Sequence, residues 1–197
     1  MILSLACLLL GILAAWKLGS PNALVVDIVI RISLGAIILC AGIDIGAKRS
    51  VLKKLSTYGP KVFLVPLAVA VGSILGGLIA APFLGMSYNE GAALAAGFGY
   101  YSLSSGILAG LGGAELGSLA FVTNIMREVF ALAFIPLLAK LHYFCAIAAG
   151  GATSMDTTLG MISHSTDEET TLISMLNGVV LSILVPILVP LLYGSVR

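Results

Sequence analysis

Long apolar runs are the feature that most constrains what this chain can fold into. Hydrophobic residues make up 59% of the 197-residue sequence and charged residues only 10%, and the mean hydropathy is +1.13. A water-soluble domain needs a larger share of charged surface, so the chain is expected to reside in a membrane. Because about 20 apolar residues cross the ~30 Å hydrocarbon core as a helix, the length allows roughly five to seven membrane segments and no sizeable soluble domain.

The first 85 residues are typical of three ordinary membrane helices. We expect helices over 1–16, 24–46 and 61–85, with a basic loop at 47–61 between the last two. Short loops rich in Lys and Arg are retained on the cytoplasmic side. The sequence therefore predicts a three-helix scaffold region, 1–85, with a cytoplasmic amino terminus. The basic residues of the cytoplasmic loop are Lys48, Arg49, Lys53, Lys54 and Lys61.

Two later segments are interrupted by polar residues. Residues 88–113 and 143–164 each contain two apolar arms of roughly ten residues, which as helix cover about half the hydrocarbon thickness. An uninterrupted apolar stretch follows each of them, at 116–139 and at 170–193. We therefore expect each interrupted segment and the helix after it to form one unit.

The two units repeat each other in sequence. ALAAGFG at 93–99 aligns with AIAAGGA at 146–152 at an offset of 53, and IPLLAK at 135–140 aligns with VPLLYG at 189–194 at an offset of 54. Two matches in the same order, with the same layout between them, indicate an internal repeat. We therefore expect a core over 86–193 that consists of the repeats 88–139 and 143–193.

The relative direction of the two units depends on how the interrupted segments cross. If each is a re-entrant hairpin, each unit crosses the membrane an odd number of times and the copies are inverted, as in many secondary transporters. If they span, the copies are parallel. Lys140 after helix 116–139 favours hairpins, which place it on the cytoplasmic side. The expected fold is an all-α integral membrane protein with five transmembrane helices and two re-entrant helical hairpins in inverted hairpin-plus-helix repeats, with the carboxyl terminus outside.

Polar breaks at membrane depth need a physical reason. Non-helical backbone survives there only against protein or a water-filled cavity, and a break exposes helix ends whose N–H and C=O groups attract ions. One interpretation is a polar solute held between the arms, which makes 86–193 a transport core. The other is a pair of kinked helices that repair their own backbone with hydroxyls. The hydroxyls that we assign to a solute site are Ser102, Ser104, Thr153 and Ser154.

Glu128 is the strongest candidate for a binding residue. It lies near the middle of helix 116–139, where a charge is costly and usually functional, and Asn124 lies one turn earlier on the same face. We interpret both as substrate or proton ligands; a structural ion pair of Glu128 is the alternative. Adjacent residues on a helix do not face each other, so we expect Arg127 to be structural, tying down hairpin carbonyls or Asp156.

Three aspartates carry separate expectations. Asp156 lies at the tip of the second interrupted segment, where it either contacts a cationic solute or caps the following arm. Asp44 lies in AGIDIG, whose small residues permit close helix approach and would bury the aspartate. The alternative is a surface ion pair with Lys48, one helical turn further along the chain. Asp27 and Arg31 have i, i+4 spacing and are expected to form a structural pair.

Four ordered motifs resemble a known family. GFGYYSLSSGIL, NIMREVFALAFIPLL, GGATSMDTTLG and LSILVPILVPLL are similar to motifs of the lysine exporters called LysO, over most of residues 35–193. The resemblance implies export of L-lysine, and of basic analogues such as thialysine, across the cytoplasmic (inner) membrane by proton antiport. Acidic residues within the membrane are implicated in transport in that family, and the RE of the second motif assigns this role to Glu128.

Longer members of that family have further amino-terminal helices with an intramembrane acid of their own. This chain is similar to the carboxy-terminal two thirds of such a member. The resemblance therefore implies a partner. That partner is either a second copy, as a homodimer in which Asp44 replaces the missing acid, or a separately encoded small membrane subunit.

Other classes of function remain as alternatives. A sodium-coupled carrier of an organic anion uses the hairpin oxygens for its ion, and a non-transporting membrane scaffold packs through faces such as Gly72 to Gly76. An enzyme is not expected, since no nucleophile, base and orienting group come together. Neither a metal site nor a cofactor is expected, apart from H⁺ or Na⁺ as coupling ion. A net charge of +1 without a basic tail gives no reason to expect nucleic acid.

Overall fold

The computed structural model of the chain describes residue 32 and residues 60–194. The first two expected helices, apart from Ile32, and most of the basic loop lie outside the described residues. The same holds for Asp27, Arg31 and Asp44. The scaffold region over 1–85 and the expected roles of these three charged residues therefore stay predictions.

The described residues from 60 onward form helices and no strands. A 3₁₀ turn, η1 (Pro60–Phe63), leads into three helices that are long and apolar enough to cross a membrane: α4 (Leu64–Phe83), α7 (Ala114–Leu141) and α10 (Glu168–Gly194). Each covers one of the long helices that the sequence predicts in this part of the chain. The all-helical class with membrane-length helices is thus confirmed for the described residues.

Both polar segments are also interrupted in the structure. The first consists of α5 (Tyr88–Ala95) and α6 (Tyr101–Gly112), which we call the first hairpin. The second consists of α8 (Tyr143–Gly150), the 3₁₀ turn η2 (Gly151–Met155) and α9 (Leu159–Ser165), which we call the second hairpin. The repeat extends into the long helices, because moving α7 along the sequence by 53 positions brings it onto α10 to within one residue.

Local sequence explains where the first hairpin begins and ends. Ser87 and Glu90 form a reciprocal capping box at the start of α5, in which the Glu90 carboxylate accepts from the Ser87 N–H at 3.0 Å. α6 ends at Gly113, whose φ of 91° lies in a region that glycine adopts without a Cβ clash. α7 starts at the next residue, so the hairpin and the long helix are joined without a loop.

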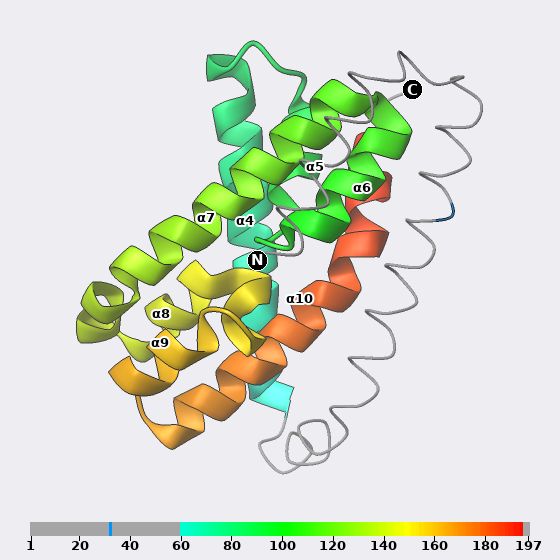
Figure 1. Cartoon of the computed structure of the whole chain (residues 1–197). Helices are drawn as coiled ribbons and strands as arrows, with labels where there is room; N and C mark the ends of the chain where they lie inside the picture. Colours follow the sequence, from blue (N-terminus) through cyan, green and yellow to red (C-terminus); the bar gives the residue numbers. More distant parts are fainter. Residues whose placement is uncertain (1–31, 33–59, 195–197) are drawn as a thin grey trace, which may run out of the picture.

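The two hairpins lie between α7 and α10. Each of these long helices packs against α5, α6, α8 and α9, and α10 also packs against η2. The long helices run in opposite directions: Leu141, at the end of α7, shares a cavity with Thr170 near the start of α10, whereas Gly112, just before α7, lies against Tyr193 near the end of α10. The hairpins accordingly approach from opposite ends of the bundle and meet near its centre (Figure 1).

α10 is central in the bundle, while α4 and α7 are peripheral. Of the most apolar 18-residue window, 56% is buried in α10, compared with 22% in α4 and 17% in α7. Large apolar side chains such as Leu67, Ile79, Phe130 and Leu137 are exposed on the peripheral helices. Such surfaces suit lipid tails or further helices, which are as apolar as these side chains.

Small residues bring α4 and the first hairpin into close contact. A Cβ placed on Gly77 of α4 would collide with the carbonyl oxygen of Gly91 in α5 and with the side chain of Ala95. Small residues let helix backbones approach in this way in membranes. The pair that the sequence singled out for helix packing, Gly72 and Gly76, instead has open space around it in the described part of the chain.

Candidate functional site

The two breaks meet directly. The backbone N–H of Ala152, in the second hairpin, donates to the carbonyl oxygen of Phe98, in the first, at 2.8 Å. The backbone turns sharply on both sides of this bond: Phe98 and Gly99 have φ values of 50° and 95°, and Gly151 has 61°. A Cβ on Gly151 would collide with the Phe98 carbonyl. We call this contact the crossing point.

Asn124 of α7 satisfies the break of the first hairpin. Its side chain is 2% exposed, and its Oδ1 accepts from the N–H of Gly99 at 2.8 Å. Its Nδ2 donates to the carbonyl oxygens of Leu94 at 3.2 Å and Ala120 at 2.9 Å. Asn124 thus pairs backbone groups on both arms of the break, as buried polar groups require.

Asn177 of α10 takes the equivalent place at the second break. Its Nδ2 donates to the carbonyl oxygen of Gly151 at 2.9 Å and to Ser154 Oγ at 3.0 Å. Its Oδ1 is buried and has no hydrogen-bond partner. Asn177 was not among the residues that the sequence assigned to the site. The signal that identifies it is its position 53 residues after Asn124, the offset of the repeat.

Three of the four hydroxyls assigned to a solute site bond to backbone of the hairpins and α10. Ser104 donates to the carbonyl oxygen of Tyr100 at 2.9 Å, and Thr153 to that of Gly150 at 2.8 Å. Ser154 lies 2.7 Å from two carbonyl oxygens, one of them in α10. These hydroxyls thus bond to backbone within the protein, as Ser and Thr side chains commonly do. Ser102 differs, because its side chain is exposed.

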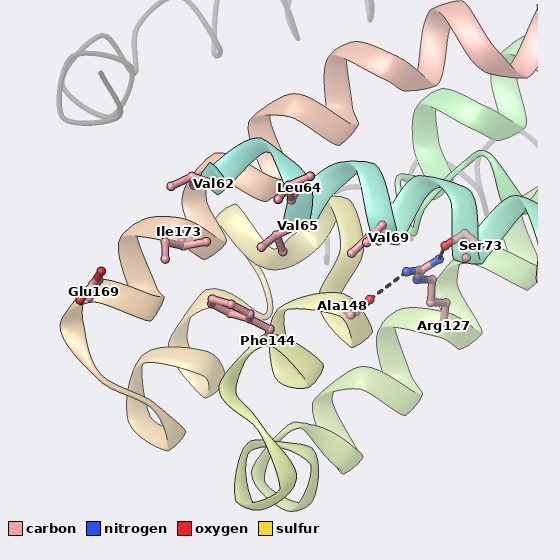
Figure 2. A pocket seen from close by; sticks show the side chains of 12 residues that line it. Val62, Leu64, Val65, Val69, Ser73, Arg127, Phe144, Ala148, Glu169 and Ile173 are labelled. Atoms are coloured by element: carbon pink, nitrogen blue, oxygen red, sulfur yellow. Dashed lines mark hydrogen bonds between the residues drawn. The ribbon is translucent and has the colours of Figure 1, made fainter. Parts of the chain in front are cut away.

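Arg127 connects three helices. Its Nη1 donates to Ser73 Oγ of α4 at 2.8 Å, and its Nη2 donates to the carbonyl oxygen of Ala148 in the last turn of α8 at 3.0 Å (Figure 2). A cation suits this position, because the C-terminal end of a helix carries partial negative charge. Ser73 was not singled out by the sequence, since a lone serine in an apolar helix carries no signal.

A cavity of about 810 Å³ lies beside Arg127. Its lining is mostly apolar, and half of the lining residues belong to α4. Arg127 of α7 and Glu169 of α10 lie at opposite ends of the labelled set (Figure 2). A second cavity of about 480 Å³ shares Phe144, Glu169 and Ile173 with it and extends to the end of α7. The two cavities together extend from the α7–α8 junction to Arg127 and Ser73.

Glu128 has a different environment from Arg127. It makes no ion pair or hydrogen bond with any described residue, and its side chain is half-buried. The phenol of Tyr101, the first residue of α6, lies within electrostatic reach of both Glu128 and Asp156. Two carboxylates from different elements thus share one neighbourhood at the N-terminal end of α6, where the helix dipole favours negative charge.

Asp156 lies at the exposed tip of the second hairpin. Its Oδ1 accepts from the N–H of Thr157 at 2.6 Å. The cap position of α9 belongs to Thr158, without a side-chain cap bond, so Asp156 does not cap that helix. Among the described residues, no group of three His, Cys, Asp or Glu side chains is placed to hold a metal ion.

Paired broken helices that meet inside a bundle of membrane-length helices define the class of this chain: a multi-pass helical membrane protein with an internal repeat. The chain belongs to the family of the lysine exporter LysO, whose family model matches residues 5–193. This is a family of transporters, not of enzymes. The match reaches further toward the amino terminus than the four motifs do.

Two relatives illustrate the similarity. A protein of Haemophilus influenzae, named as a candidate lysine exporter, is 33% identical over 188 residues, which cover 93% of this chain and 93% of the relative. The lysine exporter LysO of Escherichia coli is 35% identical over 153 residues, or 78% of this chain but only 51% of the relative. The chain thus spans about half of one relative and nearly all of the other. No solved structure matches the chain.

Proposed function

We propose that this chain exports L-lysine, and basic analogues such as thialysine, across the cytoplasmic membrane in exchange for protons. The observation that carries the proposal is the crossing point, where Ala152 and Phe98 join two broken helices; Glu128 of α7 has no ion-pair partner among residues 60–194. Broken helices with a site at their junction are a recurring device of secondary transporters. We infer the substrate from the two relatives that are named as lysine exporters.

The proposed topology has five transmembrane helices and two re-entrant hairpins. The opposite directions of α7 and α10, and the approach of the hairpins from opposite ends, support inverted hairpin-plus-helix repeats (Figure 1). With the basic loop at 47–61 inside, α7 ends inside at Lys140 and α10 ends outside. The amino terminus is then inside and the carboxyl terminus outside, with the transport core at 86–193.

The charges around Tyr101 suit a cationic amino acid. Lysine carries two ammonium groups and one carboxylate, so its site needs carboxylates as well as a donor for the anionic end. Glu128 and Asp156 supply the first, and the N–H groups at the start of α6 supply the second. Glu128 has no basic partner in the part of the chain that the structure describes, which suits a carboxylate that binds lysine and a proton in turn and makes proton antiport the simplest coupling.

Counterflow of labelled lysine in vesicles containing only the purified full chain tests this proposal. A pH gradient should drive accumulation, and Glu128→Gln should abolish it while leaving the protein inserted. Glu115→Gln is the matched control, because Glu115 lies on the same helix and is exposed in its first turn. Robust counterflow by the Glu128→Gln variant would contradict the proposed site. Accumulation driven by a sodium gradient would favour the sodium-coupled alternative.

We also propose that the active form contains a partner, either a second copy of the chain or a small membrane subunit. The relative from Escherichia coli, which extends well beyond the matched region, supports a partner. In a homodimer Asp44 would supply a second intramembrane acid. Full lysine export by an Asp44→Asn variant would remove the basis of that role, and a monomeric mass for the active protein would remove the partner.

A further inference from the structure

The internal repeat pairs the residues of the crossing point. At the offset of 53, Phe98 pairs with Gly151, Gly99 with Ala152, and Asn124 with Asn177. The backbone follows this pairing in part: Phe98 and Gly151 both have positive φ values, 50° and 61°, whereas Gly99 has a φ of 95° and Ala152 has no positive φ. A positive φ is uncommon for a phenylalanine, and here Phe98 shares it with the glycine to which the repeat pairs it.

The hydrogen bonds break this symmetry. In the first half the N–H of Gly99 donates to Asn124 Oδ1 at 2.8 Å. In the second half the paired N–H, that of Ala152, donates across the crossing point to the Phe98 carbonyl at 2.8 Å. Asn177 Oδ1 therefore lacks the donor that its counterpart has, and it is left buried without a partner. A buried acceptor in this condition needs an explanation.

The orientation of both amides is fixed by their neighbours. Asn177 Nδ2 faces the carbonyl oxygen of Gly151, which only accepts, so its Oδ1 points the other way. Asn124 Oδ1 faces the N–H of Gly99, which only donates. The unpaired oxygen of Asn177 is thus not the result of an exchanged amide nitrogen and oxygen.

We propose that Asn124 and Asn177 are paired positioning residues that exchange backbone partners during transport. Applying the repeat offset to each observed bond gives a second, mirrored set. In that set the N–H of Ala152 donates to Asn177 Oδ1, the N–H of Gly99 donates to the Gly151 carbonyl, and Asn124 Nδ2 donates to the Phe98 carbonyl. Each of these donors and acceptors still has a hydrogen-bond partner in the mirrored set. The unpaired amide oxygen is then that of Asn124 and no longer that of Asn177.

The exchange rests on the proposed function and gives it a mechanism. Two states related by the symmetry of inverted repeats open toward opposite faces of the membrane, as alternating access requires. The two states have the same number of hydrogen bonds among these backbone groups and the two amides, so a difference in solute or proton binding shifts their populations. The asymmetry at Asn177 is then the signature of one of the two states.

Opposite shifts in accessibility test the exchange. Cysteines at Ser102 and Thr157, both exposed near the breaks, report each hairpin in a background in which Cys7, Cys40 and Cys145 are replaced by serine. A membrane-impermeant maleimide is applied to vesicles without lysine, and the ratio of the two labelling rates is measured. Asn124→Ala removes more bonds from the observed state, and Asn177→Ala removes more from the mirrored state. The two variants should shift the ratio in opposite directions, each by about fivefold for one net hydrogen bond.

Ser182→Ala is the matched control, because Ser182 is buried on the same helix as Asn177 and its Oγ also has no partner. It should leave the ratio unchanged. If an alanine variant fails to insert, Asn124→Ser and Asn177→Ser provide the same comparison, since serine stays polar but does not reach the backbone groups. Shifts in the same direction, or no shift, overturn the exchange. The labelling needs no substrate, so opposite shifts without lysine counterflow would uphold the exchange and reject lysine as the solute.

Discussion

The first and second hairpins share a sequence pattern but satisfy their breaks differently. The first is held by Asn124, all of whose amide groups are used, and by close backbone contact with α4 at Gly91. The second is held by Asn177, whose Oδ1 is unpaired, and by the guanidinium of Arg127. One copy of the repeat is therefore held by a fully paired amide and by packing against α4, while the other has an unpaired amide oxygen and a contact from Arg127.

The two hairpins also differ in the turn at the tip and in the length of the helix that follows it. The first turns through a few residues into the twelve-residue helix α6. The second runs through the 3₁₀ turn η2 into the seven-residue helix α9, with the exposed Asp156 between them. A shorter helix has fewer backbone hydrogen bonds to hold it. The two copies of the repeat thus have the same chain path. The first has the longer second arm, and the second has the shorter arm and an ionisable residue at its tip.

The packing of the first hairpin should be the most sensitive to added volume. The Cβ of a Gly91→Ala variant would collide with the carbonyl oxygen of Gly77. We therefore expect overpacking to lower the free energy of unfolding by about 3 kcal/mol. Thermal unfolding in detergent measures it. Gly160→Ala in the second hairpin, where nothing lies within 4 Å of the added Cβ, is the control. Equal losses would refute the packing difference.

The polar anchoring of the second hairpin should depend on Arg127. Arg127→Leu removes the bonds to Ser73 and to the Ala148 carbonyl, which as charged hydrogen bonds contribute about 2 kcal/mol. Amide hydrogen exchange should accelerate over 143–158 and remain unchanged over 88–100. Lys140→Leu, at an exposed site of the same helix, should alter neither range. Faster exchange in both hairpins would mean that Arg127 does not distinguish them.

The turn of the first hairpin should require glycine at one position. Gly99→Ala meets only ordinary contacts, but the φ of 95° strains any residue with a Cβ, which costs about 1 kcal/mol. Gly110→Ala, in open space within α6, should be neutral or stabilising because it raises helix propensity. The melting temperatures of the two variants should therefore move in opposite directions. A stabilised Gly99→Ala variant would show that the turn tolerates a Cβ at this position.

The smallest effect concerns the start of α10. Hydrogen bonds with the side chain and the backbone N–H of Thr170 lower the pKa of the Asp167 carboxyl. Because the pKa is lowered in the folded state, this cap stabilises the folded helix end at pH values above the ordinary carboxyl range. That stabilisation is lost as the pH falls through the lowered pKa. Protection factors of the first α10 amides should therefore fall in acid. Asp167→Asn keeps a good cap without titrating, so acid sensitivity that persists in this variant would exclude Asp167 as its cause.

The sequence by itself determined the helices and their interruptions. Membrane-length helices α4, α7 and α10 follow from long apolar runs, and the breaks follow from glycines and hydroxyls within them. Both are local properties, because backbone groups in lipid must be paired within the same segment. The repeat offset is also visible in the sequence, and residue numbers alone are enough to relate Asn124 to Asn177.

Only the tertiary structure decided which polar groups meet. Ala152 bonds to Phe98 although 54 positions separate them, and Arg127 reaches Ser73 on a helix whose sequence gives no hint of it. Among the described residues, the close contact of α4 with the first hairpin is at Gly77, while Gly72 and Gly76, the face that the scaffold alternative uses, have open space around them. Such contacts depend on the direction and rotation of several helices at once, and neither is encoded in the residues of one helix alone.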